Sequence, residues 1–337
     1  MITKSGIHEF HLAPLQGYTE VEFRRAWSAV FSGFTDAISP FIPLAEGARF
    51  RERHLRDVLP KENRRMPVVP QVLGKDPRKF TQLAIRLQDL GYETVNWNLG
   101  CPKRTVARKK RGSGILPYPD LLRETLEKIM PSLPLKLSIK TRLGYEQPEE
   151  FYELVSVYND FPLESLIIHP RTGIQQYEGE MHLKVLDETI DNIRQKIIFS
   201  GDISDVRTFQ NLSERYPQIH NWMIGRGILS NPALTEIIQG REASGDKEIL
   251  GSRQNYFHQE LYCEIRAKLM RSRTILNKMK DYWSYFSLWF EDSEQLFYKL
   301  ARTNDLDDFM NLAKRILNEQ PLAPVEGRSN RQIKVGK

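Results

Sequence analysis

The segment "PDLLRETLEKIMPSLPLKLSIKT" (Pro119–Thr141) contains the pattern that decides the fold. Its first part, residues 119–134, has apolar residues at helical spacing and prolines near both ends, which predicts a helix. Its second part, residues 135–141, is a short apolar run bounded by polar residues, as buried parallel strands are. A helix that leads directly into such a strand is the repeating element of an α/β fold.

The same alternation recurs along most of the chain. Short apolar runs predict strands over residues 10–14, 36–40, 67–72, 94–98, 135–141, 165–169, 196–200 and 221–225. Most of the gaps can hold a helix, and residues 77–91 show helical spacing that ends at a glycine. Eight strands alternating with helices over roughly 240 residues predict a (β/α)8 TIM barrel. The alternative is a doubly wound sheet, but "APLQGYTE" after the first strand lacks the glycine-rich dinucleotide turn that such sheets often have.

The pattern changes near Gly245. Residues 253–291 and 293–320 have helical patterns with no strand signal between them, which indicates a small all-helical bundle. We therefore expect a barrel domain over residues 1–242 and a helical domain over 243–322. Residues 323–337 form a basic tail that we expect to be flexible, because it has few apolar residues.

Composition limits the classes of protein that fit. No apolar run reaches the ~18 residues that a membrane helix needs, and "MITKSGIHEF" has no apolar signal core. Two cysteines form no disulfide framework. We expect a cytoplasmic monomer with no membrane association and no metal centre. The net charge of +6 permits an anionic partner without requiring one.

Polar residues collect where the predicted strands end, which is the edge of a TIM barrel that carries the chemistry. In chain order they are Pro14 and Leu15 with the following Gln16 and Gly17; Gln71; Asn96, Asn98 and Cys101; Lys140 and Arg142; His169 and Arg171; Ser200, Gly201 and Asp202; and Gly225, Arg226 and Gly227. The glycines of the last two turns allow backbone N–H groups to approach an anion, and Arg226 can add donors. These turns predict a site for a phosphorylated cofactor, although they could be ordinary tight turns.

Lys140 lies inside an otherwise apolar strand, where a cation is costly without an anionic partner. The N1–C2=O2 edge of a flavin becomes anionic on reduction and would suit it. The alternative is a salt bridge inside the barrel. His169 could equally be a core histidine with satisfied hydrogen bonds.

Cys101 lies in "NLGCPKRTVARKKRGSG" (98–114), directly before a run of six basic residues. Its place in a Gly-Cys-Pro turn after a strand favours a catalytic thiol over a structural one, whereas Cys263 lies on a predicted helix and is expected to be structural. The basic residues are Lys103, Arg104, Arg108, Lys109, Lys110 and Arg111. They predict phosphate contacts, and the alternative is a solvated loop.

The blocks "APLQGYTEVEFR", "NWNLGCPKRTVARKKRGSGIL", "SIKTRLG", "IHPRTGIQQYEG" and "MIGRGILSNP" together resemble the tRNA-dihydrouridine synthase family. They occur in that family's order and cover about residues 10–235. The resemblance implies reduction of the C5=C6 bond of a uridine in the tRNA D-loop, with FMN that is reduced by NADPH. Two positions depart from the family: Ser200 stands where Asn is usual, and Pro170 where Gly is more common.

The resemblance also assigns residues. It implies a proton from Cys101 to uracil C5 after hydride transfer from flavin N5 to C6, with Asn98 facing the base. The implied FMN ligands are Pro14, Leu15, Gln71, Lys140, His169, Ser200, Gly201, Asp202, Gly225 and Arg226. Residues expected at the tRNA are Asn98, Lys103, Arg104, Arg108, Lys109, Lys110, Arg111, Arg142, Arg171, Tyr177, Arg271 and Lys278.

Two other functions fit part of the sequence. One is a different FMN-dependent barrel reductase for a small molecule, of the dihydroorotate or old-yellow type. The other is a non-catalytic RNA-binding protein that has kept the barrel. The basic loop and the basic helical segment argue against the first, and the thiol, lysine and phosphate turns argue against the second.

Overall fold

A computed structural model describes residues 8–44, 52–241, 246–324, 327 and 331–334. The chain folds into two compact units. Unit 1 comprises Met1–Thr35, Asp202–Gln218 and Ile224–Lys337, and unit 2 comprises Asp36–Gly201 and Ile219–Met223. The predicted boundary between residues 242 and 243 lies outside the described residues.

The strands form one sheet with parallel pairing. They are β1 (Glu9–Leu12), β2 (Asp36–Ile38), β3 (Ile42–Pro43), β4 (Val68–Val69), β5 (Gln71–Leu73), β6 (Thr94–Leu99), β7 (Lys136–Gly144), β8 (Ser165–Thr172), β9 (Lys196–Ser200) and β10 (Asn221–Ile224). Their order is β3-β5-β6-β7-β8-β9-β10-β1-β2-β4. The ladders with a defined register, such as β6 with β7 and β7 with β8, are all parallel.

The strands at the two ends of this order, β3 and β4, are connected because β4 continues directly into β5, the neighbour of β3. The predicted strand 67–72 is two short strands, β4 and β5, separated by Pro70. β2, in the second predicted strand, pairs with β4, and β3, which follows that strand and was not predicted, pairs with β5. The third predicted strand therefore lies beside the second strand and the residues that follow it. Counted as eight predicted strands, the order is circular. The sheet is therefore the predicted TIM-type barrel, and the doubly wound alternative is wrong.

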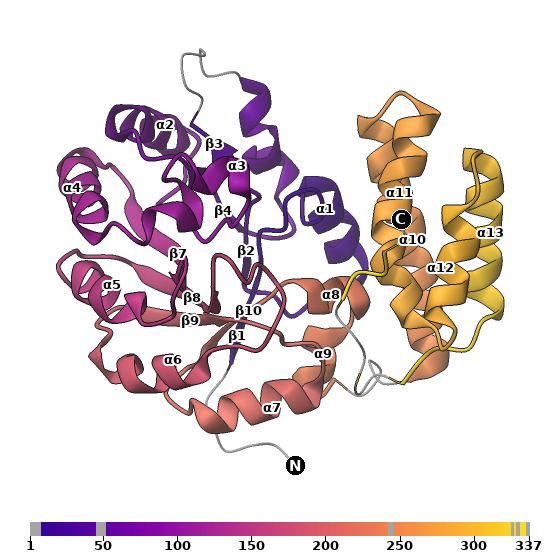
Figure 1. Cartoon of the computed structure of the whole chain (residues 1–337). Helices are drawn as coiled ribbons and strands as arrows, with labels where there is room; N and C mark the ends of the chain where they lie inside the picture. The colour runs from indigo at the N-terminus through magenta and orange to yellow at the C-terminus, as the bar shows by residue number, and fades with distance from the viewer. Residues whose placement is uncertain (1–7, 45–51, 242–245, 325–326, 328–330, 335–337) are drawn as a thin grey trace. The chain divides into compact units, whose positions relative to one another are not determined.

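Helices cover the outer side of the unit 2 strands (Figure 1). They are α2 (Pro77–Asp89), α4 (Pro119–Ile129), α5 (Glu150–Asn159) and α6 (Leu183–Thr189). The short helix α3 (Arg104–Ala107) lies in the loop after β6, and the short 3-10 segments are η1 (Glu52–Val58), η2 (Pro60–Glu62), η3 (Gly112–Ile115), η4 (Met130–Ser132) and η5 (Ile190–Asn192). The helix predicted for 119–134 ends earlier, because its last part is η4. Asp76 caps α2 by accepting a hydrogen bond from the Lys79 backbone N–H at 3.1 Å.

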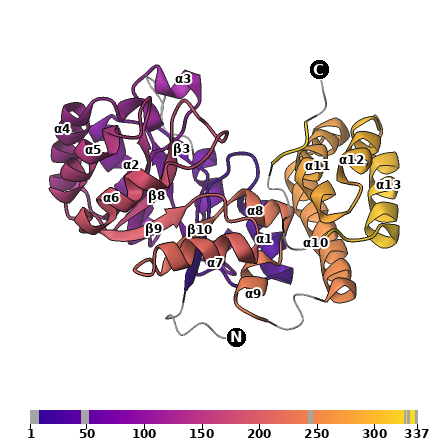
Figure 2. The same ribbon diagram turned by 60° about the horizontal axis from the view of Figure 1, so that its bottom comes forward.

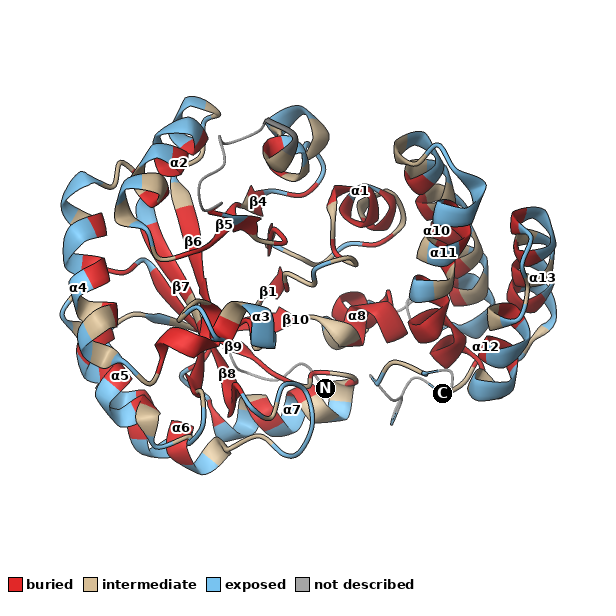
Figure 3. Ribbon diagram, turned by 45° about the horizontal axis from the view of Figure 1, so that its top comes forward, coloured by how far each residue is buried: buried red, intermediate tan, exposed pale blue. Residues whose placement is uncertain are grey.

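Burial follows the helical spacing read from the sequence. The buried side of α2 carries Phe80, Leu83, Ala84 and Leu87, and the residues between them are exposed or partly exposed. Figure 3 shows the same one-sided burial on α4 and α5, while β6, β7 and β8 are buried along most of their length. This is the pattern of a parallel sheet covered by amphipathic helices.

Unit 1 is mainly helical. It contains β1 with α1 (Val21–Val30), α7 (Val206–Arg215), α8 (Arg226–Ser230), α9 (Leu234–Ile238), α10 (Lys247–Lys268), α11 (Ser272–Phe286), η7 (Ser287–Trp289), α12 (Ser293–Ala301) and α13 (Leu306–Glu319). Figure 2 shows α10 to α13 as one helical group. Between residues 246 and 324 the only β contact is a single bridge, Phe290 with Leu322, so the all-helical prediction is confirmed. None of the described helices is both long and apolar enough to cross a membrane.

Packing joins the C-terminal helices to the N-terminal segment of the same unit. Phe23 on α1 meets Phe257 on α10 edge to face, with ring centroids 5.6 Å apart. In the predicted tail, Gln332 donates to Tyr18 Oη and to Ser284 Oγ, both at 2.9 Å. Residues 325–326, 328–330 and 335–337 of that tail lie outside the described residues.

Candidate active site

A chain of buried side-chain amides crosses β5, β6 and β7. Asn98 Nδ2 donates to Gln71 Oε1 at 2.7 Å, and Gln71 Nε2 donates to Asn96 Oδ1 at 2.8 Å. Asn96 Nδ2 continues the chain to Ser138 Oγ at 2.7 Å. Every link runs between strands that pair directly, so the sheet fixes the position of Asn98.

Asn98 in turn holds the loop that carries Cys101. Its Oδ1 atom accepts hydrogen bonds from the Gly100 N–H at 3.1 Å and from the Cys101 N–H at 2.9 Å. The Cys101 carbonyl accepts from Ser113, from the backbone N–H at 3.1 Å and from Oγ at 3.0 Å. Gly112 has φ +55°, and a Cβ there would lie 2.6 Å from the Cys101 oxygen, so only glycine fits. The thiol therefore sits on a fixed loop.

The Cys101 side chain is buried, with 9% of its surface exposed. Burial raises the pKa of the thiol above its usual range, and a backbone hydrogen bond from Lys103 and the charges of Lys103 and Arg142 oppose that rise only in part. A raised pKa keeps the thiol protonated at neutral pH. The group is therefore suited to donate a proton rather than to act as a ready nucleophile.

Arg142, at the end of β7, supports the same loop. Its Nε donates to the Gly100 carbonyl and its Nη1 to the Thr172 carbonyl, both at 2.8 Å. Burial lowers the pKa of Arg142 to about 10, so it stays charged at neutral pH. Its guanidinium lies 5.4 Å from the Tyr177 ring centroid. The structure thus places this expected tRNA residue as a brace between two loops.

Lys140 lies two residues earlier on β7 and is only partly exposed. Burial, aided by the charge of Arg142, lowers the pKa of its ammonium to about 7. No carboxylate among the described residues pairs with it, so the salt bridge considered from the sequence finds no partner. A partly buried lysine that pairs with none of the described acids is suited to an anionic ligand.

His169 and Arg171 lie at the end of β8. Arg171 Nη1 lies 3.2 Å from His169 Nε2, and Arg171 Nη2 donates to the Gly179 carbonyl at 2.8 Å. Both side chains are buried, whereas Tyr177, whose ring centroid is 6.3 Å from that of His169, is 45% exposed. Of the three, Tyr177 presents the largest surface to a ligand.

The predicted phosphate turns are tightly built. A Cβ at Gly201 would lie 2.6 Å from Met181 Sδ, and one at Gly227 would lie 2.1 Å from the Ile203 carbonyl oxygen. In unit 1, Asp202 has φ +37° and its Oδ1 accepts from Arg226 Nη2 at 2.8 Å. Gly225 is the residue before α8, and Ser200 is the last residue of β9.

In the loop after β1, Leu15 N–H donates to Thr19 Oγ1 at 2.8 Å, and Thr19 Oγ1 donates to Ala13 O at 2.7 Å. Pro14 lies between Ala13 and Leu15 in this loop. Lys278 Nζ on α11 donates to the Gly17 carbonyl and lies 3.5 Å from Glu20 Oε2. Lys278 is therefore engaged in holding this loop. Arg271, just before α11, is exposed.

The basic residues after Cys101 differ in their surroundings. Lys103, Arg104, Arg108 and Lys109 are exposed on and around α3. Lys110 has φ +51°, and its ammonium lies 3.7 Å above the centroid of the Tyr118 ring. Arg111 is partly buried and lines a surface pocket next to α2.

Sequence reasoning missed the residues that support the site. It did not assign Ser113, which anchors the Cys101 carbonyl, or Ser138, which ends the amide chain. A polar residue inside the apolar run 135–141 was the available signal for Ser138. Cys263, expected to be structural, is exposed on α10. The described residues contain no cluster of His, Cys, Asp or Glu that could hold a metal ion.

Comparisons with known proteins agree with the motif assignment. The model of the dihydrouridine synthase (Dus) family matches residues 11–320. A protein of Staphylococcus aureus (strain COL) named "Probable tRNA-dihydrouridine synthase" is 32% identical over 235 residues, 66% of this chain and 69% of the relative. "tRNA-dihydrouridine synthase B" of Pasteurella multocida is 28% identical over 233 residues, 68% of each chain.

Among solved structures, morphinone reductase aligns with a TM-score of 0.49 and 13% identity over 72% of this chain and 88% of that chain. The family model covers most of the chain and includes the strand ends and α10 to α13. The chain belongs to the dihydrouridine synthase family of enzymes.

Proposed function

We propose that this protein reduces the C5=C6 bond of a uridine in the D-loop of tRNA to 5,6-dihydrouridine, with FMN as cofactor and NADPH as reductant. The observation that carries the proposal is the state of Cys101. Its thiol is buried and kept protonated, its backbone is held by Asn98 and Ser113, and exposed basic residues follow it closely in the chain. A positioned acid beside a phosphate-binding surface suits proton delivery to a base in RNA.

The residues present fit a flavin. Lys140 is a lysine of lowered pKa that no acid in the described part of the chain pairs with, and such a group suits the anionic edge of a reduced flavin. Gln71 and His169 also belong to the residues that we propose to hold the cofactor, as do Pro14, Leu15, Ser200, Gly201, Asp202, Gly225 and Arg226. Bound FMN would supply the hydride that is added to uracil C6.

The protein's own chemistry completes the reduction. After C6 gains a hydride, negative charge develops at C5 and O4 of the uracil, and the Cys101 S–H bond breaks as its proton forms the C5–H bond. The thiolate left on sulfur is favoured by the Lys103 N–H and by the charges of Lys103 and Arg142. One hydride and one proton together balance the added H2. Solvent then restores the thiol proton.

A uracil stacked in RNA cannot reach a barrel site, so we propose that the nucleotide is flipped out of its stack. The exposed Lys103, Arg104, Arg108 and Lys109 would bind the flanking phosphates, with Tyr177 and Arg271 as further contacts. Arg142 and Arg171 would act by holding the loops in place, since their donors already bind carbonyl oxygens.

The deciding experiment is reconstitution. Purified protein is incubated with FMN, NADPH and unmodified tRNA transcript, and dihydrouridine is measured by mass spectrometry of nucleosides. We expect formation that depends on both NADPH and tRNA. Flavin released by heat and run on chromatography should be FMN. NADPH oxidation driven by orotate or by an enone, without any effect of tRNA, would instead identify a small-molecule reductase.

A further inference from the structure

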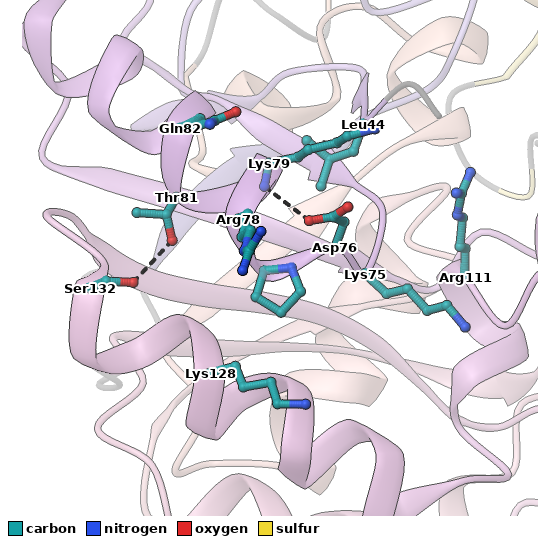
Figure 4. A pocket seen from close by; sticks show the side chains of 11 residues that line it. Leu44, Lys75, Asp76, Arg78, Lys79, Thr81, Gln82, Arg111, Lys128 and Ser132 are labelled. Carbon is teal, nitrogen blue, oxygen red and sulfur yellow. Dashed lines mark hydrogen bonds between the residues drawn. The ribbon is translucent and has the colours of Figure 1, made fainter. Parts of the chain in front are cut away.

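A basic surface pocket lies between α2 and α4 of unit 2, next to the end of the Cys101 loop. Its cavity volume is about 920 Å³. Its lining includes five cations: Lys75, Arg78, Lys79, Arg111 and Lys128. Figure 4 shows the side chains of Lys75 and Arg111 on one side of the pocket, and Lys128 reaching toward it from α4.

Few acids compensate this charge. Asp76 is the carboxylate of the described lining, and it already accepts the Lys79 backbone N–H as the cap of α2. Lys128 pairs with Glu124. Neither Lys75 nor Arg78 has an ion pair with any acid that the structure describes. These five cations together with the carboxylates of Asp76 and Glu124 carry a formal charge of +3.

The chemistry of the lining selects the kind of ligand. Small-molecule sites of this size are usually apolar and enclosed. Here the apolar lining residues are Leu44 and Pro77, which give a planar base little to stack on. Polar groups of Thr81, Gln82 and Ser132 accompany the cations, and the hydroxyl groups of Thr81 and Ser132 lie 3.1 Å apart. Long cations with hydroxyl and amide groups are what proteins use on a sugar-phosphate backbone.

Position links the pocket to the catalytic loop. Arg111 belongs to both the basic run after Cys101 and the pocket lining, and the next residue, Gly112, packs against Cys101. Lys75 and Arg78 follow the carboxyl end of β5, the same edge of the sheet from which Cys101 follows β6. The basic surface therefore continues from the catalytic loop onto the outside of the barrel along α2.

We propose that this α2/α4 pocket is a second docking surface for tRNA, which binds backbone phosphates beyond the flipped nucleotide. The inference rests on the proposed function and adds a contact surface to it. Its contribution is to affinity and not to the chemical step, because none of its side chains belongs to the residues proposed to touch the base or FMN. It extends the phosphate-binding surface past the residues recognised in the 103–111 run.

The test compares two double variants with equal loss of charge. Lys75→Ala/Arg78→Ala removes cations from the pocket. Arg64→Ala/Arg65→Ala removes two exposed cations before β4, at the opposite edge of the sheet. Binding of tRNA transcript without NADPH is measured from low to moderate salt. Each lost phosphate contact reduces the log–log salt slope by ~0.7–0.9, so the pocket variant should lose roughly one to two units. The control should keep the wild-type slope.

Further readouts separate the possible outcomes. Lys75→Arg/Arg78→Lys keeps the charge and should keep the wild-type slope, which excludes loss of folding as the cause. The KM for tRNA should rise about tenfold at moderate salt in the pocket variant, while kcat at saturating tRNA and NADPH-driven flavin reduction stay unchanged. Equal slopes in both alanine variants, or a raised KM for NADPH alone, would overturn the docking surface. A wild-type protein that makes no dihydrouridine would instead overturn the proposed function.

Discussion

At the scale of single residues, Cys101 allows the sharpest test of the mechanism. We expect Cys101→Ala to retain FMN and NADPH oxidation but to reduce tRNA ~10²–10⁴-fold more slowly, the usual contribution of a general acid. The thiol acts on the uracil and not on the flavin, so the flavin half-reaction should survive. Single-turnover mixing of the reduced protein with tRNA measures the affected step. Cys263→Ala, exposed on α10, is the control, and activity of Cys101→Ala within a few-fold of wild type would make Cys101 structural.

Lys140 permits a second prediction at the scale of single residues. Its readout is the midpoint potential of the bound flavin rather than a reaction rate. We expect Lys140→Met to make the bound flavin harder to reduce, because the ammonium favours the anionic reduced form. Burial lowers the pKa of Lys140 to about 7, so without a ligand the lysine is protonated below that pH and loses its proton above it. The preference of the wild-type apoprotein for reduced over oxidised FMN should accordingly weaken as the pH rises through 7.

The control for this prediction lies on the same strand. Lys136, at the start of β7, is exposed and 3.5 Å from Glu164, so Lys136→Met should leave the midpoint potential unchanged. A potential that is the same in both variants and in wild type would remove Lys140 from the flavin site.

At the scale of elements, α10 and α11 clamp the segment after β1 through a charge cluster. Lys268 lies 3.2 Å from Glu20 and 3.0 Å from Glu22, and Lys278 adds its contacts to Gly17 and Glu20. Burial alone would raise the pKa of Glu20, but the two lysines hold it below its usual range. A lowered pKa contributes stability above the unfolded-state value, and that stability is lost as the pH falls through the folded-state value.

We therefore expect Lys278→Met to lower the melting temperature at pH 7 by a few degrees, and to lower it less once the pH has fallen through the lowered pKa of Glu20. We expect no change in the salt slope of tRNA binding from this substitution, although the sequence suggested Lys278 as an RNA contact. Arg271→Met is the matched variant. Arg271 is exposed just before the same helix, so Arg271→Met should leave the melting temperature unchanged and reduce the log–log salt slope of tRNA binding by ~0.7–0.9. If Lys278→Met instead flattens the salt slope and leaves the melting temperature unchanged, Lys278 is an RNA contact.

Many of the helices and strands could be predicted from the sequence, because parallel strands and the helices that cover them have local patterns of apolar residues. The run 196–200 coincides with β9, and the proline and glycine signals bracketed α2 closely. The division of 67–72 into β4 and β5 was not foreseen. Pro70 has no N–H for a ladder, and which neighbours the two pieces choose depends on barrel closure, a property of the whole sheet.

The candidate site, too, could be predicted only in part from the sequence. Cys101, Lys140 and Asn98 could be singled out because each is a polar or reactive residue at an apolar strand end. The role of Arg142 as a brace could not, because it depends on carbonyls of two loops, at Gly100 and Thr172, that come together only in three dimensions. For the same reason Lys278 looked like an RNA ligand, whereas its partners Gly17 and Glu20 are more than 250 positions away along the chain.

At the scale of the whole molecule, the excess of basic residues has an electrostatic consequence for a polyanionic substrate. The chain has 49 Lys and Arg against 43 Asp and Glu, a modest excess of +6. Such an excess supports tRNA binding only if it is concentrated, and the run 103–111 concentrates six cations without an acid. Association should therefore depend steeply on salt, whereas reduction of the flavin by NADPH, which needs no RNA, should vary little between variants of this run.

The run itself predicts which cations matter. Arg104, Arg108 and Lys109 are exposed, so Arg104→Ala/Arg108→Ala/Lys109→Ala should weaken tRNA binding and reduce the log–log salt slope by roughly two to three units. Lys110 lies over the Tyr118 ring, so Lys110→Ala should reduce the slope by much less than the ~0.7–0.9 expected for one phosphate contact. The measurement is affinity against salt for the three proteins, with flavin reduction by NADPH followed in parallel. If the triple variant keeps the wild-type slope, the run is only a solvated loop beside the thiol. If Lys110→Ala matches a full phosphate contact, its ammonium leaves Tyr118 when RNA binds.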